Sequence, residues 1–377
     1  MKVLIFICGE GLGHTSRCTA LGQELLAAGH EVYLGAYGYS KEFIERKGYK
    51  TVEIPPEIKL VGDSGSLDLK KSVISTLKSG SVFGIFKVLS LLKEKKPDIV
   101  VTDSYFTGVV ASKIRVIPVY LMVNQSNMET FFKNGGVVLR TMGGIIKQFY
   151  TCIFRIVNRI IIPDFPMPYT VCRLNLVFEE KVSKNLFFSG PLTLEKFDDV
   201  KAEVLQKPHV LSLIGGFGYR EPIFRKVIEV AKLDRNINYT LLSGPNLNPD
   251  VFSNLPENVT IKRFINDQFP YLKASDLVIA PGGHSTIMEA LTFGVPMLSF
   301  PDINHSEQES NAAIVDLEGY GRRMDYNASP EEILQAIREL LKDKKIHQKV
   351  EDMKKLSKDL NATAAIKKLL ESNNTRN

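Results

Sequence analysis

The sequence predicts an α/β fold in which two similar domains are each built on a parallel sheet covered by helices. Short apolar runs typical of buried strands alternate with helical segments, the pattern of helix-covered parallel sheets. A glycine-rich turn follows the first strand, and a second such turn lies at residues 215–220. The 377 residues suit about two or three domains. The expected strands of the first half span residues 3–7, 31–36, 99–102 and 117–123.

We expect a first domain at residues 1–190, a linker at 191–207 and a second domain at 208–377 that ends in a terminal helix. Residues 195–208 are charged and weakly patterned, whereas residues 209–214 begin a new strand. Because the second glycine-rich turn mirrors the first, the two domains are expected to face each other across a cleft.

Composition argues against a metal centre, a disulfide scaffold and a membrane-spanning protein. Cys8, Cys18, Cys152 and Cys172 lack C-x-x-C spacing, and we interpret them as reduced, cytosolic thiols. The apolar run at residues 3–7 is too short for a signal peptide. No uncharged stretch reaches the roughly 18 residues that a membrane span needs. We therefore expect a cytoplasmic protein and no nucleic-acid partner.

The most informative segment is residues 280–312. An apolar strand at residues 277–280 precedes Gly282 and Gly283, after which a helix is expected to begin and to end at Gly294. Backbone N–H groups and the positive end of this helix would lie at the carboxyl edge of the strand. Such a helix start is a site for a diphosphate.

Polar side chains surround this predicted helix start. His284, Ser285 and Thr286 supply donors, and the Glu289 carboxylate, one turn later, could accept from a ribose diol. The pair Thr286 and Glu289 also has the spacing of a capping box, so Glu289 is evenly balanced between a helix cap and a ligand.

Glu307 and Gln308 follow a second predicted strand at residues 296–300. A carboxylate beside a carboxamide offers acceptors and donors to vicinal hydroxyls. On spacing alone, however, the pair is equally typical of a solvated loop.

The combined pattern G-G-H-S-T-x-x-E-A-L-x-x-G-V-P, followed by E-Q-x-x-N-A, resembles the donor signature of the GT-B glycosyltransferases. The resemblance is to the UDP-glycosyltransferases and to the MurG-type, family 28-like enzymes of cell-wall synthesis. It implies two Rossmann-like domains, with the diphosphate of a nucleotide sugar on His284, Ser285 and Thr286. The ribose would lie on Glu289.

The same resemblance assigns the rest of the donor. Glu307 and Gln308 would hold the sugar, and the segment at residues 263–267 would place the uracil against Ile265. The glycines expected at the donor site are Gly215, Gly216 and Gly283.

The amino-terminal turn at residues 9–14 has the spacing G-x-G-x-G, not the G-x-G-x-x-G of dinucleotide-binding folds. The next strand, at residues 31–36, also lacks a terminal acidic residue for an adenosine ribose, which argues against a nicotinamide enzyme. The turn resembles the first loop of MurG-type transferases, with Glu10 and Leu12 as departures. Gly11 and Gly13 would then let an acceptor approach the backbone.

His14 occupies the histidine position of that loop, and the resemblance makes it the general base that removes the acceptor proton. The alternative is a histidine that caps the helix with Thr15 or Ser16. Asp103 ends the strand at residues 99–102 and resembles the aspartate that orients such a histidine. Its alternative is a cap on a helix at residues 105–113.

The sequence has no D-x-D pair of the kind that holds a divalent ion on a diphosphate. We therefore expect no metal and no cofactor besides the UDP-sugar co-substrate. Helix ends and fixed donors would stabilise the leaving nucleotide, with Arg220 and Arg263 as helpers.

Basic residues punctuate the apolar sequence at residues 131–162. Lys133, Arg140 and Lys147 lie seven apart, which would keep them near one helical face and suits contact with anionic lipid headgroups. The alternative is an ordinary core helix with a solvated edge. A second stretch, at residues 82–96, could join the same surface.

The resemblance implies an inverting, metal-independent glycosyltransferase that moves a hexose-type sugar from a UDP-sugar to a hydroxyl acceptor. The MurG-type resemblance extends this to a lipid or lipid-linked acceptor and to the inner face of the membrane. Two alternatives stay open: a nucleotide-sugar epimerase or hydrolase of the same fold, and a non-catalytic sugar-nucleotide-binding subunit. The sequence does not name the sugar.

Overall fold

The computed structural model describes residues 1–9, 12–57, 61–78, 84–133, 136–216, 218–263, 265 and 267–374. The chain forms two compact units. The first comprises Met1–Val61, Asp68–Leu194 and Leu360–Asn377, and the second comprises Gly62–Leu67 and Glu195–Asp359. We describe each unit by itself.

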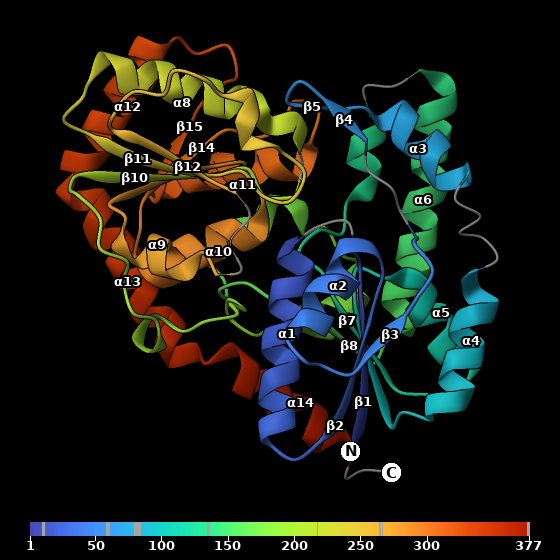
Figure 1. Cartoon of the computed structure of the whole chain (residues 1–377). Helices are drawn as coiled ribbons and strands as arrows, with labels where there is room; N and C mark the ends of the chain where they lie inside the picture. The colour runs from blue at the N-terminus through green and yellow to red at the C-terminus, as the bar shows by residue number, and fades with distance from the viewer. Residues whose placement is uncertain are drawn as a thin grey trace. The chain divides into compact units, whose positions relative to one another are not determined.

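The first unit is built on a seven-stranded parallel sheet with the order β3-β2-β1-β6-β7-β8-β9 (Figure 1). Its strands are β1 Lys2–Ile7, β2 Glu31–Ala36, β3 Thr51–Glu53, β6 Ile99–Asp103, β7 Val119–Met122, β8 Arg159–Ile162 and β9 Leu186–Phe188. The helices are α1 Leu12–Ala27, α2 Gly38–Arg46, α3 Leu69–Lys78, α4 Gly84–Lys95, α5 Phe106–Ile114, α6 Val137–Ile156, α7 Glu180–Ser183 and α14 Ala362–Asn374.

Alternate residues of β1 enter two separate cores, because successive side chains of a strand point to opposite faces. Val3, Ile5 and Ile7 pack with α1 and α14, whereas Leu4 and Phe6 pack with α4, α5 and α6. All five side chains are fully buried. Burial on both faces explains why this strand reads as a continuous apolar run.

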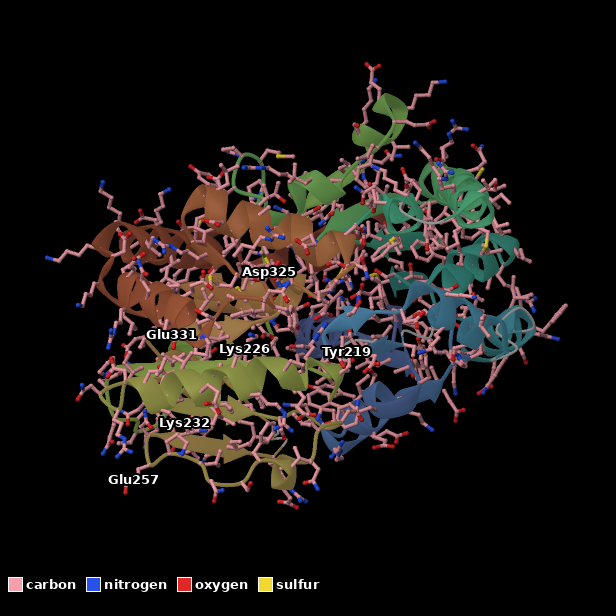
Figure 2. The ribbon with its side chains drawn as sticks, turned by 90° about the horizontal axis from the view of Figure 1, so that it is seen from above. Tyr219, Lys226, Lys232, Glu257, Asp325 and Glu331 are labelled. Carbon is pink, nitrogen blue, oxygen red and sulfur yellow. The ribbon has the colours of Figure 1, made fainter. Side chains whose placement is uncertain are left out.

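The second unit contains a six-stranded parallel sheet with the order β12-β11-β10-β13-β14-β15. These strands are β10 His209–Leu213, β11 Asn238–Leu242, β12 Val259–Lys262, β13 Leu277–Ala280, β14 Met297–Ser299 and β15 Gly321–Arg323, and a separate hairpin comprises β4 Gly62–Asp63 and β5 Ser66–Leu67. The helices are α8 Glu221–Leu233, α9 Phe269–Ala274, α10 His284–Phe293, α11 Ser306–Glu318, α12 Pro330–Lys342 and α13 Lys344–Leu360. Figure 2 shows Lys226 and Lys232 on α8, with Tyr219 just before this helix.

Both sheets place their first strand in the middle, between the second strand and a later one. The order therefore reverses between β1 and β6 in the first unit and between β10 and β13 in the second. Loops that leave such a pair diverge at the carboxyl edge, where open α/β sheets bind their ligands. The predicted α/β class with two Rossmann-like domains is confirmed, and the position of each candidate site follows from this reversal.

The expected domain boundaries differ from the observed units at three places. The terminal helix α14 belongs to the first unit because Ile366 and Leu370, both fully buried, join the core of β1 and α1. Lys367 of α14 also binds Glu24 of α1 at 2.8 Å. Residues 62–67, expected in the first domain, form the hairpin of the second unit. Most of the predicted linker also belongs to the second unit, which begins again at Glu195.

Candidate active site

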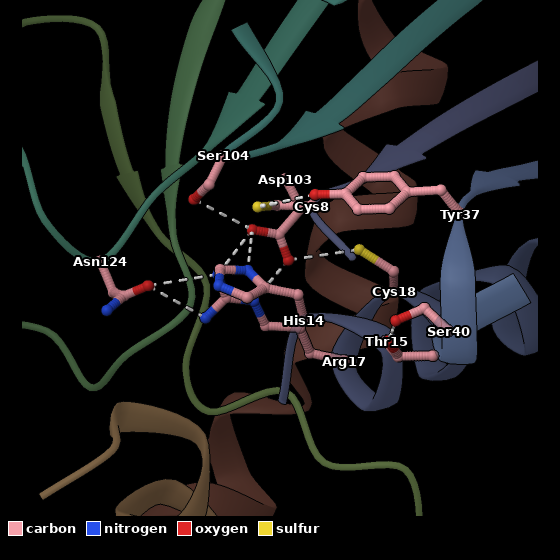
Figure 3. Close-up of polar contacts among 10 residues, drawn as sticks. All are labelled: Cys8, His14, Thr15, Arg17, Cys18, Tyr37, Ser40, Asp103, Ser104 and Asn124. Atoms are coloured by element: carbon pink, nitrogen blue, oxygen red, sulfur yellow. Dashed lines mark hydrogen bonds and ion pairs between the residues drawn. The ribbon is translucent and has the colours of Figure 1, made fainter. Parts of the chain in front are cut away.

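The first cluster of functional side chains lies at the carboxyl edge of the first unit, between β1 and β6. His14 is in the first turn of α1, and Asp103 is the last residue of β6. His14 Nδ1 lies 2.9 Å from Asp103 Oδ1 (Figure 3). The Asp103 side chain is fully buried, whereas that of His14 is 26% exposed. This contact leaves Nε2 as the nitrogen of His14 that can exchange a proton with another molecule.

Arg17 binds the same carboxylate at two points. Its Nε donates to Asp103 Oδ2 at 2.6 Å and its Nη2 donates to Oδ1 at 2.5 Å, with the arginine side chain only 3% exposed. Both terminal nitrogens also donate to Asn124 Oδ1 at 3.2 Å. We did not identify Arg17 from the sequence. Arg17 lies three residues after His14, and the helix that puts both side chains on one face begins at Leu12, before His14, which the sequence did not indicate.

The electrostatics of this cluster keep Asp103 ionised. Burial alone raises the pKa of the Asp103 carboxyl, but the charges of Arg17 and then His14 outweigh it and hold this pKa well below its ordinary value. Arg17 Nη2 also lies 2.9 Å from His14 Nδ1. Since arginine only donates, Nδ1 accepts from Arg17 in one tautomer and donates to Asp103 in the other. Only the second tautomer leaves Nε2 free to accept a proton.

The capping alternatives for these two residues are wrong. The ring of His14 binds Asp103 and lies inside the first turn of α1, and Asp103 binds α1 side chains instead of the start of α5. The first two N–H groups of α5 donate instead to the Glu57 carboxylate, at 2.8 and 2.6 Å. Of the predicted acceptor loop, Gly13 lies in the first turn of α1, and Gly11 lies outside the described residues.

In the second unit, a helix begins directly after β13, as predicted. Gly283 is the N-cap residue of α10 and makes no side-chain cap, and a Cβ built on it would meet nothing within 4 Å. A Cβ on Gly282, in contrast, would collide with the backbone of Gln308. The helix ends at Gly294 in the left-handed conformation, with φ of 72°. Gly282 is therefore required by close packing against Gln308. Gly283 instead leaves open space above the start of the helix.

The side chains around this helix start are not used as caps. His284 is 4% exposed, and Ser285 and Thr286 are half-buried in the first turn of α10. The predicted capping box is absent from α10, because the helix begins at His284 and Thr286 is already inside it. Glu289 is 5% exposed, and its Oε2 accepts from Gln268 Nε2 at 2.7 Å. The alternative reading of Glu289 as a cap is therefore wrong.

The remaining predicted donor residues lie on neighbouring loops of the second unit. Gly215 and Gly216 lie in the loop that begins one residue after the end of β10. Position 215 favours glycine because its φ is 66°, in the left-handed region. Asn246 Nδ2 donates to the Gly216 carbonyl at 2.6 Å and joins the loops after β10 and β11. Ile265 is half-buried between β12 and α9, and its two neighbours lie outside the described residues.

A fully buried carboxylate, that of Asp302, organises the loop between β14 and α11. Arg220 donates to it through Nε at 2.8 Å to Oδ1 and through Nη2 at 2.6 Å to Oδ2. The hydroxyl of Tyr219 donates to Oδ2 at 2.8 Å. Burial raises the pKa of Asp302, but Arg220 outweighs it and holds this pKa below the ordinary value. Arg220 could be singled out from the sequence, whereas Asp302 could not.

Gln308 belongs to this cluster and not to a solvated loop. It lies in the first turn of α11 and is 3% exposed. Its Oε1 accepts from the backbone N–H of Asp302 at 2.9 Å, and its Nε2 donates to Asp302 Oδ2 at 3.0 Å. Glu307, next to it, is half-buried and 3.4 Å from Asn311 Nδ2. The solvated-loop alternative is wrong for Gln308, since the amide stabilises the loop.

The two arginines expected to help the leaving nucleotide have other partners. Arg220 is buried in its ion pair with Asp302. Arg263 is on the surface, where its Nη2 donates to Asp250 Oδ2 at 2.7 Å and to Asn248 Oδ1 at 3.0 Å. Their role toward the leaving nucleotide stays a prediction.

Helix α6 presents two of the three basic residues predicted for a membrane surface. Arg140 and Lys147 are exposed on it, with Lys147 Nζ 3.5 Å from Glu129. Lys133 lies outside the helix, directly after the 3₁₀ turn Met128–Phe132, so the seven-residue spacing does not place it on the same face. The expectation of one shared helical face is therefore wrong for Lys133.

One face of α6 packs on the core, and another exposes large apolar side chains. Tyr150 and Ile153 are buried, whereas Val138 is 74%, Ile145 67% and Phe149 45% exposed. The three exposed residues follow the helical repeat and form one stripe, which we call the α6 apolar stripe. The second predicted basic stretch begins outside the described residues and continues as α4. No helix among the described residues is long and apolar enough to cross a membrane.

All four cysteines lie within the described residues, and none forms a disulfide. Cys18 Sγ donates to Asp103 Oδ2 at 3.3 Å, and burial, followed by the charge of Asp103, raises the pKa of this thiol well above its ordinary value. Cys18 is therefore a neutral neighbour of the His14 cluster.

Comparisons with known proteins agree with this architecture. Residues 212–369 match the glycosyltransferase family 28 C-terminal domain, and residues 1–165 match glycosyl transferase family 1. A protein described as an uncharacterized glycosyltransferase of Methanosarcina acetivorans is 60% identical over 371 residues, which cover 98% of each chain. The UDP-N-acetylglucosamine--N-acetylmuramyl-(pentapeptide) pyrophosphoryl-undecaprenol N-acetylglucosamine transferase of Bacillus pumilus is 27% identical over 98% of this chain and 97% of its own.

Solved structures show the same fold. The calicheamicin glycosyltransferase CalG4 superposes with a TM-score of 0.73 at 18% identity, over 98% of this chain and 97% of its own. The chain belongs to the GT-B glycosyltransferases.

Proposed function

We propose that this glycosyltransferase moves a hexose from a UDP-linked donor to a hydroxyl group, with inversion at the anomeric carbon. The proposal rests on the His14–Asp103 pair, in which a buried carboxylate contacts one ring nitrogen of a partly exposed histidine. The pair lies where the strand order reverses, which is where open α/β sheets bind ligands. A histidine held in this way is suited to general-base chemistry near neutral pH.

In the proposed step, His14 Nε2 removes the proton from the acceptor hydroxyl. The hydroxyl oxygen forms a bond to the anomeric carbon from the side opposite the diphosphate, and the carbon–oxygen bond to UDP breaks. UDP leaves with the bonding electron pair, and Asp103 stabilises the imidazolium that results. Asp103 is suited to this role because Arg17 keeps it ionised.

The donor diphosphate is proposed to lie at the start of α10. Supporting observations are the open space above Gly283 and the side chains of Ser285 and Thr286 in the first turn. The helix dipole and the backbone N–H groups of the first turn favour an anion there without a divalent ion. Glu289 would accept from the ribose, and Gln268, its present partner, could turn to another group when the ribose binds.

The nucleotide and sugar are proposed from relatives and chemistry together. The Bacillus pumilus relative is named for transfer from UDP-N-acetylglucosamine. A second N–H of Gln308 and the carboxylate of Glu307 can serve the hydroxyls of a hexose. These groups suit glucose, galactose, glucuronic acid and N-acetylglucosamine alike.

The acceptor is proposed to be a lipid or lipid-linked hydroxyl on the cytoplasmic face of a membrane. The α6 apolar stripe supports this, because an exposed apolar surface can enter the headgroup region. Arg140 and Lys147 are exposed on the same helix, about half a turn away from the stripe, and are the cations proposed to meet anionic lipids. The name of the Bacillus pumilus relative includes a pyrophosphoryl-undecaprenol acceptor.

The test measures binding of UDP, UMP and the UDP conjugates of the four sugars named above to the 377-residue chain, in the presence of EDTA. A ligand that binds only the folded state raises the unfolding temperature by mass action. We expect UDP to stabilise the protein more than UMP. Once a lipid-linked hydroxyl acceptor is added, we expect at least one UDP-hexose to be consumed, with UDP released and the acceptor glycosylated in the inverted anomeric configuration. Equal effects of UMP and UDP would remove the diphosphate assignment, and loss of binding in EDTA would remove the metal-independent mechanism.

A further inference from the structure

The hairpin at residues 62–67 is a segment of the amino-terminal half of the sequence that folds as part of the second unit. The chain leaves the first unit after Val61 and returns to it at Asp68. The hairpin pairs Gly62 with Leu67 and Asp63 with Ser66. A two-stranded hairpin of this length is not stable alone, so its conformation depends on what it packs against.

Backbone hydrogen bonds attach the hairpin to the loop before α11. Leu67 N–H donates to the Ile303 carbonyl at 2.9 Å, and Ile303 N–H donates to the Gly65 carbonyl at 2.9 Å. Gly65 N–H donates to the Tyr219 carbonyl at 2.7 Å. Asn304 Nδ2 adds a side-chain bond to the hydroxyl of Ser66 at 3.2 Å. The hairpin therefore continues the backbone pairing of the loop at residues 302–305.

Two glycines of the hairpin fit against two tyrosine rings. A Cβ built on Gly62 would lie 2.6 Å from the ring of Tyr219, and one built on Gly65 would collide with the ring of Tyr326. Gly65 also has a φ of 80°, in the left-handed region. The close approach requires that both positions lack a side chain.

The same two tyrosines reach the carboxylate of Asp302 through their hydroxyl groups. Tyr219 donates to Oδ2 at 2.8 Å and Tyr326 donates to Oδ1 at 3.4 Å. Asp302 in turn holds the amide of Gln308 through two hydrogen bonds. A continuous set of contacts therefore runs from the hairpin glycines through the tyrosines and Asp302 to Gln308.

We infer that this hairpin is a positioning element of the donor-sugar site, which fixes the loop at residues 302–308 so that Glu307 and Gln308 meet the hexose of the donor. The inference rests on the proposed function, because it assigns these two residues to the sugar. It deepens that function by giving six residues of the amino-terminal half a part in donor selection. Among the described residues, the hydrogen bonds of the hairpin go to Tyr219 and to the loop before the sugar residues, so we expect its disturbance to weaken sugar binding more than diphosphate binding.

The test compares Gly65→Ala with Gly48→Ala in the full-length chain. Both glycines have positive φ, 80° and 82°, so both variants carry similar backbone strain. Only the Gly65 variant collides with a neighbour, since a Cβ on Gly48 meets nothing within 4 Å. Tyr219→Phe, which removes one hydroxyl bond to Asp302 and keeps the ring, is the second variant. It provides the test if Gly65→Ala does not fold, as judged by circular dichroism.

The measurement is the dissociation constant of each variant for UDP and for the UDP-hexose that the wild type binds most tightly, by titration calorimetry. We expect Gly65→Ala and Tyr219→Phe to weaken UDP-hexose binding at least about fivefold more than UDP binding, the scale of one lost hydrogen bond. Gly48→Ala should keep the wild-type ratio. If the ratio of the two dissociation constants is unchanged in Gly65→Ala and Tyr219→Phe, the inference about the hairpin is overturned, and the proposed function is not affected. A wild-type chain that binds neither ligand overturns the proposed donor, and the inference with it.

Discussion

His14 and Arg17 contact the same oxygen of Asp103, at 2.9 and 2.5 Å, from successive turns of one helix. The arginine keeps the carboxylate ionised, and the ionised carboxylate accepts a hydrogen bond from the histidine tautomer that carries its proton on Nδ1. Removal of His14 is therefore expected to lower the rate of sugar transfer, whereas removal of Arg17 is expected to lower the stability of the fold.

Replacing His14 with Ala should reduce sugar transfer by about 100-fold or more, the usual scale for a general base, and leave UDP affinity nearly unchanged. His30→Ala, which removes a histidine bound to Glu371 in the same unit, is the control and should keep full activity. Initial rates and UDP titrations provide both values. A small loss of rate with weakened acceptor binding would show that His14 positions the acceptor instead.

Replacing Arg17 with Gln should lower the free energy of unfolding by about 3–5 kcal/mol, because it leaves a buried charge without its partner. Arg155 makes a similar two-point contact with Glu179 on the surface, and Arg155→Gln should change stability little. Urea denaturation of both variants measures the difference. Equal losses of unfolding free energy in Arg17→Gln and Arg155→Gln would show that burial of the Asp103 carboxylate does not make its ion pair more important for stability.

Asp302→Asn should make the stability of the protein less dependent on acid pH. The folded-state pKa of Asp302 is depressed, so its ionised form stabilises the fold above the unfolded-state value of about 3.9. This contribution is lost as the pH falls through the folded-state pKa. The stability gap between wild type and variant should therefore be constant above pH of about 5 and narrow below about 4. Asp359→Asn, on the exposed side of α13, is the control, and its stability should stay close to that of the wild type across this pH range.

Glu289→Gln should weaken UDP binding by about 10- to 100-fold, the range for one hydrogen bond to a charged group. The substitution keeps a polar partner for Gln268, and α10 does not depend on Glu289 for a cap, so the unfolding temperature should change little. Glu331→Gln, exposed on α12, is the matched control. If Glu289→Gln destabilises the fold and leaves UDP affinity unchanged, the carboxylate is structural.

Arg140→Gln combined with Lys147→Gln should reduce binding to vesicles that contain phosphatidylglycerol, by about 1 kcal/mol for each cation. The effect should shrink as the salt concentration rises, because the Debye length falls. Lys344→Gln with Lys345→Gln, on α13 of the second unit, removes the same charge elsewhere and should leave co-sedimentation unchanged. Wild-type protein that ignores anionic vesicles would make a soluble acceptor the better explanation.

Local sequence patterns predicted the parts of the structure that local physics decides. The buried strands, the helix between His284 and Gly294, and the turn glycines follow from apolar runs and backbone conformation. His14 and Asp103 could be paired because His14 follows the first strand and Asp103 ends a neighbouring strand of the same sheet.

The missed features depend on contacts between distant segments. Asp302 is the centre of a buried cluster only because Tyr219 and Arg220 from one turn and Tyr326 from another loop converge on it. Lys133 had the right spacing, but the helix begins after it, at Val137. Nothing in the spacing of Gly62 and Gly65 indicated that two tyrosine rings would pack on them.

The return of α14 to the first unit limits how this enzyme can be recombined with its relatives. The chain passes between units after Val61, Leu67, Leu194 and Asp359. A chimera joined at one point near residue 195 would combine α14 of one parent with the β1 core of the other, and the hairpin of one parent with the tyrosines of the other. Exchange of donor preference between relatives therefore calls for a transplant of residues 62–67 together with 195–359, with the final helix retained from the recipient.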